Sequence, residues 1–303
     1  MPQTFYGPYD ERNQDYANSG NANLGRFPLG HRLILPDDRE YRFCLNDGTA
    51  EIAGRLYQSV ASVSGHLNRA VDVVRAIDAA LASATLVTTL AAIDIYAEGV
   101  AHTNDVTGEG YAYRIRRAFT AGAAHAAAAA TGVLTVNFAA GEMLQVALDT
   151  TSEITFTRNR YHQVLITAAP PTAGISGCSP GVAAADRFYW SQIRGYAAVL
   201  ASGTLRAGLP VMCGITTAGS VESTKRRIQV GASTTLVLTS NGSFAFLDSG
   251  GVTTGFSILA VSSSVAAQGI DITGGIAQNG PTVGICVKAN PSTDHALINL
   301  DIC

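Results

Sequence analysis

Charged residues are scarce in this chain. Asp, Glu, Lys and Arg make up 14% of its 303 residues, against roughly 25% in typical soluble domains. The formal net charge is −3, so the chain lacks the basic excess typical of a nucleic-acid-binding protein. Because a soluble monomer normally covers its surface with charge, the shortage predicts that other subunits cover part of this surface.

Lysine is almost missing: Lys225 and Lys288 are the only two, and the other basic residues are arginines. Arg binds carboxylates bidentately and is enriched at protein interfaces, where Lys is depleted. A GC-rich genome would give the same bias, because it favours Arg and Ala codons. The sequence leaves both explanations open.

The chain also lacks a disulfide framework. Its five cysteines are an odd number and form no C-x-x-C pair, which argues against both disulfides and structural zinc. Residues 1–20 have no basic and apolar leader, so they do not resemble a secretory signal. The long uncharged stretches 118–140 and 249–270 are rich in small residues, which argues against a membrane span. We expect free thiols in a reducing cytosol.

No motif for a cofactor or a catalytic metal is present: there is no P-loop, no dinucleotide fingerprint and no H-E-x-x-H. Asp248-Ser249-Gly250-Gly251 resembles the serine motif of trypsin-like proteases, and His125 precedes it as in that family. The oxyanion hole of those enzymes needs a glycine where this chain has Leu247, and Ala126 replaces the cysteine after the histidine. We therefore predict no catalytic residues, no metal and no cofactor.

Three smaller features have modest interpretations. His102 and Asp105 have a spacing that fits a weak metal contact, but two loop residues without further ligands are more typical of a solvated turn. The basic clusters are Arg114-Arg116-Arg117 and 225–227. In a near-neutral chain they favour pairing with carboxylates across a subunit contact over contact with nucleic acid.

The pattern of apolar residues predicts a mainly β fold, with β-sandwich or barrel-like domains, an extended N-terminal arm and little helix. Short Val-, Ile- and Thr-rich runs recur about every ten residues, bounded by Gly and Pro. We predict an arm over 1–40, a β-rich domain over 41–170 and a second β-rich domain over 171–303. Residues 228–280 carry only two charges and read as an insertion in the second domain.

Within the first domain, 66–82 fits a short helix by apolar spacing, although its valines leave a strand possible. A turn is expected at Asp47-Gly48, because Gly accepts positive φ. Val283–Val287 and Ala296–Ile302 are expected to pair as a closing hairpin. The remaining expected strands of the two domains are 41–45, 50–57, 85–90, 93–100, 111–115, 133–138, 144–148, 154–157, 164–168 and 196–200.

Aromatic residues are concentrated at two places. The arm carries aromatics on a polar, irregular segment, which favours docking on a neighbouring subunit, while a disordered tail is the alternative. Tyr189 and Trp190 are candidates for a local core or for an interface, with the core favoured. The candidate anchors of the arm are Phe5, Tyr6, Tyr9, Tyr16 and Phe27.

The order of several motifs resembles a β-rich family of virion proteins of tailed bacteriophages. The resemblance covers about residues 40–225 and 283–302. The matching motifs are Tyr41–Gly48, Ala53–Gln58, Gly108–Ile115, Asn159–Val164, Tyr189–Gly195, Ala218–Glu222 and 283–300.

The resemblance implies a non-enzymatic virion subunit, and we favour a head decoration (cement) protein located on the head surface. Its implied partners are the major capsid protein and copies of itself, as a homo-oligomer such as a trimer. The alternatives are a tail, tail-tube or fibre protein, a major capsid protein, a secreted adhesin or carbohydrate-binding module, and a trypsin-like hydrolase.

Overall fold

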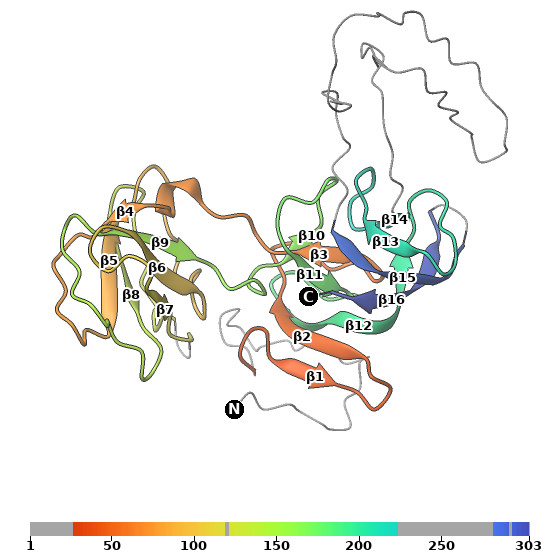
Figure 1. Ribbon diagram of the computed structural model, residues 1–303, viewed down its shortest axis with the longest axis horizontal. Coiled ribbons are helices and arrows are strands. Elements are labelled where there is room, and N and C mark those ends of the chain that lie inside the picture. The colour runs from red at the N-terminus through yellow and green to blue at the C-terminus, as the bar shows by residue number, and fades with distance from the viewer. Residues whose placement is uncertain (1–26, 119–120, 224–280, 291–292, 303) are drawn as a thin grey trace, which may run out of the picture. The chain divides into compact units, whose positions relative to one another are not determined.

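The structure is a computed structural model that describes residues 27–118, 121–223, 281–290 and 293–302 (Figure 1). The chain divides into two compact units, 1–224 with 280–303 and 225–279, and all described residues belong to the first. This unit is mainly β, as the sequence predicted. Among the described residues, the only helical element is one 3₁₀ turn, Ser64–His66.

The largest element is a ten-stranded sheet in which every pair of strands is antiparallel. The strand order is β10-β3-β11-β12-β16-β15-β13-β14, and the hairpin β1–β2 joins it through β12. We call this part the large-sheet lobe. Its strands are β1 (Arg32–Ile34), β2 (Glu40–Leu45), β3 (Leu56–Gln58), β10 (Leu165–Ile166), β11 (Ile175–Cys178), β12 (Phe188–Leu200), β13 (Pro210–Cys213), β14 (Val221–Ser223), β15 (Thr282–Lys288) and β16 (His295–Asp301).

The thirteen-residue strand β12 organises the large-sheet lobe. Its first half pairs with β2 and its second half with β16, and Arg194 lies opposite both Glu40 and Asp301. The register with β2 shifts between Gln192 and Arg194, and Gly195 follows with φ +83°, a conformation that favours glycine. The strand therefore exchanges one partner for another at this irregularity.

Two smaller sheets form from residues 69–157, which we call the small-sheet lobe. One sheet has the order β4-β9-β6-β7 and the other is the pair β5-β8. Twenty-one buried apolar residues form a single core here, with Leu134 and Ile154 fully buried. The strands are β4 (Arg69–Ala70), β5 (Leu81–Thr85), β6 (Val100–Asp105), β7 (Ala112–Arg114), β8 (Val133–Asn137) and β9 (Glu153–Thr157).

The helix considered for 66–82 is absent, and the structure corrects that interpretation. Val74 and Ile77 are 62% and 58% exposed, so the residues with helical spacing do not form a buried face. Backbone N–H groups of this segment bond to distant strands and loops instead, as in Val71 N to Ser152 O (2.9 Å) and Arg75 N to Leu148 O (2.8 Å). Tertiary pairing outweighs a weak local helical preference.

Several expected strands are shorter than predicted or absent. The segments 86–90, 93–99 and 144–148 form turns and irregular backbone, and only Leu56–Gln58 of the expected strand 50–57 is extended in a sheet. The closing hairpin is confirmed, because β15 and β16 pair antiparallel with Cys286 opposite Ile298.

Two further expectations differ from the structure. Strands from both sides of residue 170 share one sheet, since β3 pairs with β10 and with β11, so the sheets do not divide at that residue. Gly48 does not have positive φ. Its turn is stabilised by Asp47, whose Oδ1 accepts the Thr49 N–H at 2.8 Å.

Candidate functional site

Phe27 is the one arm anchor whose position the structure describes, since Phe5, Tyr6, Tyr9 and Tyr16 lie outside the described residues. Its ring packs on Trp190 and Phe43, at centroid distances of 5.4 and 5.5 Å, and stacks on His31 at 5.2 Å. Trp190 and Phe43 are fully buried. The described end of the arm is therefore anchored on the chain's own aromatic cluster.

Tyr189 is fully buried, like Trp190, so both are core residues in this fold and neither is available to another chain. The Tyr189 hydroxyl lies near the carboxyl of Glu51, which is 2% exposed. Burial raises the pKa of Glu51 to about 8, although the neighbouring hydroxyl groups of Tyr57 and Tyr189 oppose the rise. Glu51 is therefore protonated at neutral pH, and its burial keeps it from any substrate.

Asp94 and His125 form a closed network in the small-sheet lobe. The Asp94 carboxylate accepts the backbone N–H groups of Gly122, Ala124 and His125 at 2.5, 3.0 and 3.1 Å. His125 Nε2 accepts the Tyr96 N–H at 3.1 Å, while Nδ1 lies 2.8 Å from the Ala126 carbonyl. Both ring nitrogens are occupied by the backbone, so His125 is not placed to act as a general base.

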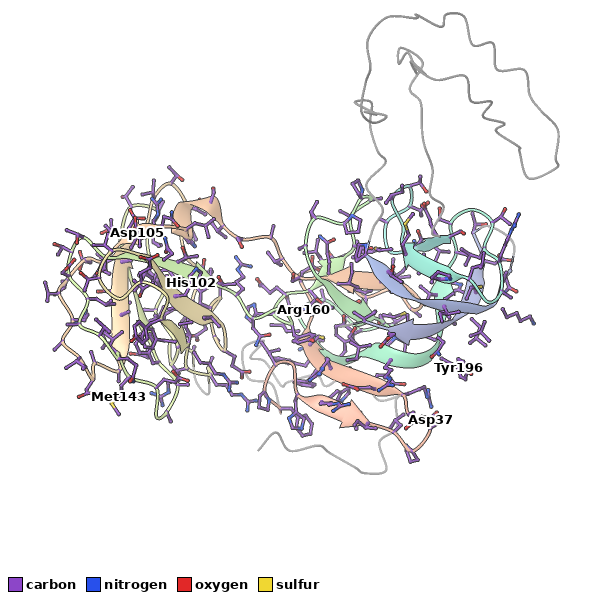
Figure 2. All side chains as sticks on the ribbon, viewed as in Figure 1. Asp37, His102, Asp105, Met143, Arg160 and Tyr196 are labelled. Atoms are coloured by element: carbon purple, nitrogen blue, oxygen red, sulfur yellow. The ribbon has the colours of Figure 1, made fainter. Side chains whose placement is uncertain are left out.

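The other residues considered for chemistry are not brought together. Ser249 lies outside the described residues. His102 and Asp105 both lie on β6 (Figure 2), opposite Thr155 and Glu153 of β9, and no third metal ligand joins them in the described part of the chain. Within the described ranges, no three His, Cys, Asp or Glu residues are close enough to hold a metal ion.

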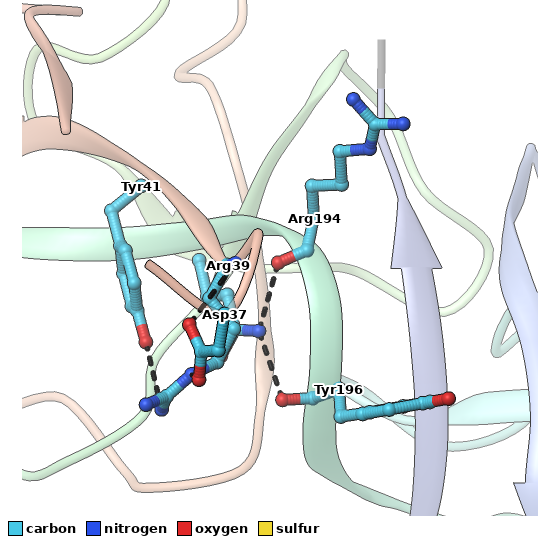
Figure 3. A network of polar contacts seen from close by, with 6 residues as sticks. Asp37, Arg39, Tyr41, Arg194 and Tyr196 are labelled. Atoms are coloured by element: carbon cyan, nitrogen blue, oxygen red, sulfur yellow. Dashed lines mark hydrogen bonds and ion pairs between the residues drawn. The ribbon is translucent and has the colours of Figure 1, made fainter. Parts of the chain in front are cut away.

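A polar network surrounds the point where β12 changes partner (Figure 3). Gln192 Nε2 donates to the carbonyls of Arg194 and Tyr196, each at 3.0 Å. Arg39 Nε donates to Asp37 Oδ2 at 2.6 Å, and Arg39 also reaches the Tyr41 hydroxyl at 3.2 Å. These contacts surround the irregularity of the sheet at Gln192 to Gly195.

An open groove of about 530 Å³ lies beside this network. Arg39, Gln192 and His295 contribute polar groups to it, and Val182 and Tyr196 contribute apolar surface. Val182 is 70% exposed and Tyr196 59% exposed. The groove can accept side chains of another protein, but it contains no nucleophile paired with a base.

Arg114, Arg116 and Arg117 line a second groove, of about 460 Å³, in the small-sheet lobe. We call it the basic groove; Ile115 and residues 138–140 complete its lining. Arg117 Nε pairs with Glu98 Oε1 at 2.9 Å. Burial raises the pKa of Glu98, and Arg117 acts against that rise. Among the described residues named as anchors from the sequence, Arg114 and Arg116 are exposed, and Arg117 is half-buried.

The four described cysteines are buried free thiols, and burial raises the pKa of each one. They are therefore poor nucleophiles. No helix among the described residues is long and apolar enough to cross a membrane.

Sequence reasoning missed the buried carboxyl groups of Asp94 and Glu51. Asp94 stands between two isoleucines and Glu51 between Ala50 and Ile52. A single acidic residue inside an apolar run is the signal that could have found them, since a buried carboxyl group needs donors or a proton.

Comparison with models of protein families, with curated proteins and with solved structures found no match to this chain.

Proposed function

We propose that this chain is a structural subunit of a tailed-phage virion, and specifically a decoration protein that bridges capsid subunits on the outer head surface. One observation carries the proposal: large apolar side chains are exposed on both lobes of a charge-poor β scaffold. Examples are Leu90 at 63%, Val182 at 70% and Tyr196 at 59% exposure. Such side chains suit contacts with neighbouring subunits.

The character of the scaffold supports the same role. A protein that reinforces a shell acts through many weak contacts repeated by symmetry, which requires a rigid body. The buried polar network around Asp94 and the network around Arg39 supply that rigidity. The arm, with Phe27 anchored on Trp190, is proposed to extend the contact to a neighbouring subunit.

A decoration role is favoured over a major capsid protein. The latter fold is expected to need a long spine helix, and the part of the chain that the structure describes contains one three-residue 3₁₀ turn. The buried, fully occupied His125 gives a trypsin-like hydrolase no support.

The test is to add the purified chain to heads that lack it and to image them by cryo-electron microscopy. We expect density at regular positions on the head surface and a higher temperature of shell disruption. Assembly with tail components and no binding to heads would refute the decoration role and place the protein in the tail.

Two pairs of substitutions identify the lobe that touches the shell. Val182→Ser with Tyr196→Ser alters the large-sheet lobe, and Val74→Ser with Ile77→Ser alters the small-sheet lobe. All four side chains are exposed, so the fold should tolerate the changes. We expect one pair to weaken shell binding at least about tenfold, with the other as its matched control. If neither pair weakens binding, the exposed apolar side chains do not carry it.

A further inference from the structure

We propose that the chain associates with itself head to tail, with the turn 105–111 of one copy seated in the basic groove of the next. We call this turn the acidic turn. The inference rests on the proposed function, because it names the contact between neighbouring copies on the shell. It concerns only the small-sheet lobe.

The acidic turn presents an apolar tip between two carboxylates. Asp105, Val106 and Glu109 are exposed, Val106 by 48%. Val106 has φ +63°, and this left-handed conformation is strained for a β-branched residue. The fold thus holds an apolar side chain outward in a conformation that valine rarely adopts, which points to a contact made by that tip.

Hydrogen bonds fix the turn in this shape. Asp105 Oδ1 accepts the Val106 N–H at 2.8 Å, and Gly110 N donates to Thr103 O at 3.0 Å. Thr107 Oγ1 donates to Asp149 Oδ2 at 2.9 Å. Because the turn is already ordered, little conformational entropy is lost when it binds.

The basic groove has the complementary character. Arg114 and Arg116 are exposed and stand two residues apart on one face of an extended segment, while Ile115 between them is fully buried. Neither of these two guanidinium groups has a carboxylate within ion-pair distance among the described residues. Ala139 and Ala140 supply an apolar wall, and arginine stems can cover an apolar tip while their charged ends reach carboxylates.

The geometry requires a second copy. The acidic turn and the basic groove lie toward opposite ends of the hairpin β6–β7, in which Val100 pairs with Arg114 and Glu98 N bonds to Arg116 O. Arg114 lies opposite Val100, and five residues of β6 separate Val100 from Asp105, or roughly 16 Å. The turn therefore cannot reach the groove of its own chain. Contact between different patches of identical chains is heterologous, and it closes into a ring where the rotation permits.

The test uses the full chain and measures its association constant by sedimentation at low and high salt. We expect self-association that weakens as salt rises. Two charge reversals, Arg114→Glu with Arg116→Glu and Asp105→Arg with Glu109→Arg, should each weaken association at least about tenfold, because like charges then face each other. An equimolar mixture of the two variants should associate again, since the turn of each variant is complementary to the groove of the other.

Two further variants separate the contact from general effects of charge and folding. Arg206→Glu changes an exposed arginine outside the small-sheet lobe and should leave association unchanged. Val106→Gly removes the apolar tip and relieves the strained φ, so it should weaken association without lowering the unfolding temperature. Near-ultraviolet circular dichroism checks that each variant is folded.

A chain that stays monomeric at all concentrations would overturn the proposal. So would charge reversals that leave association unchanged, or a mixture that does not restore it. Because no shells are present, the outcome is independent of shell binding. A chain that self-associates as predicted but ignores heads would refute only the decoration role.

Discussion

Glu51 is buried in surroundings that are unusual for a carboxyl group. Its carboxyl group is enclosed beside Tyr57 and Tyr189, and burial raises its pKa to about 8. The folded chain therefore keeps a proton that the unfolded chain releases above about pH 4.5. Raising the pH from 4.5 to 8 favours unfolding through this group.

His162 acts in the opposite direction. Burial and the charge of Arg158 lower its pKa to about 3, so the unfolded chain binds a proton below about pH 6.5 that the folded chain does not bind. Between pH 4.5 and 6.5, rising pH lowers the free energy of unfolding through Glu51 and raises it through His162, so the two effects oppose each other. The fall in the free energy of unfolding that Glu51 causes should therefore be visible between pH 6.5 and 8.

We predict that the free energy of unfolding falls between pH 6.5 and 8 by about 1.4 kcal/mol per pH unit. Glu51→Gln should remove most of this slope of the free energy of unfolding against pH. Urea unfolding at pH 6.5, 7.2 and 8 measures it. Glu142→Gln, which changes a partly exposed carboxylate, should keep the slope of the parent. An unchanged slope in Glu51→Gln would show that Glu51 is already ionised in the folded chain.

At the scale of elements, the hairpin β15–β16 depends on a close approach at Gly284. This glycine has φ +157°, and a Cβ there would overlap the carbonyl oxygen of Asn299 on the partner strand. We predict that Gly284→Ala lowers the free energy of unfolding by about 2–4 kcal/mol, as measured by urea denaturation.

Gly48→Ala is the matched control, because a Cβ at Gly48 meets nothing within 4 Å and Gly48 does not have positive φ. It should change the free energy of unfolding by less than about 0.5 kcal/mol. Equal losses in the two variants would mean that the hairpin does not depend on the approach at Gly284.

The same hairpin shows what sequence can predict about elements. Residues 295–301 alternate exposed and buried, and that period of two is visible in the sequence itself. The segment 66–82 also has a readable period, but its backbone bonds to Leu148 and Ser152, seventy or more residues away in sequence. Non-local pairing of this kind leaves no local pattern.

The candidate surfaces also differ in whether a local sequence pattern reveals them. The three clustered arginines were found from sequence because they are adjacent along the chain. For the acidic turn, the sequence predicted only that Asp105 lies in a solvated turn, since the outward position of Val106 depends on a φ that composition does not reveal.

For the whole molecule, the points where the chain leaves and re-enters the large sheet are close together. Val211 on β13 pairs with Ser223 of β14 on one side and with Gly284 of β15 on the other. Two strand spacings separate these neighbours, or about 10 Å. A short linker can therefore replace the residues between them.

We predict that replacing residues 225–279 with four Gly and Ser residues leaves the unfolding temperature unchanged or raises it, because a shorter loop costs less entropy to close. A variant with the same 55 residues in scrambled order keeps the loop length. It therefore separates the effect of loop length from the effect of losing contacts made by residues 225–279. A fall of more than about 5 °C in both variants would show that residues 225–279 stabilise the large sheet.

The position of β16 in the sheet also limits the order in which the strands can pair during synthesis. This last strand lies between β12 and β15 and closes its main pairings only after residue 301 has been added. During synthesis, one edge of the second half of β12 therefore stays unpaired until residues 295–301 have been made. Because β12 pairs with both β2 and β16, it joins segments far apart in the sequence, which makes folding slow. The unpaired edge of β12 is prone to aggregation until β16 has been made.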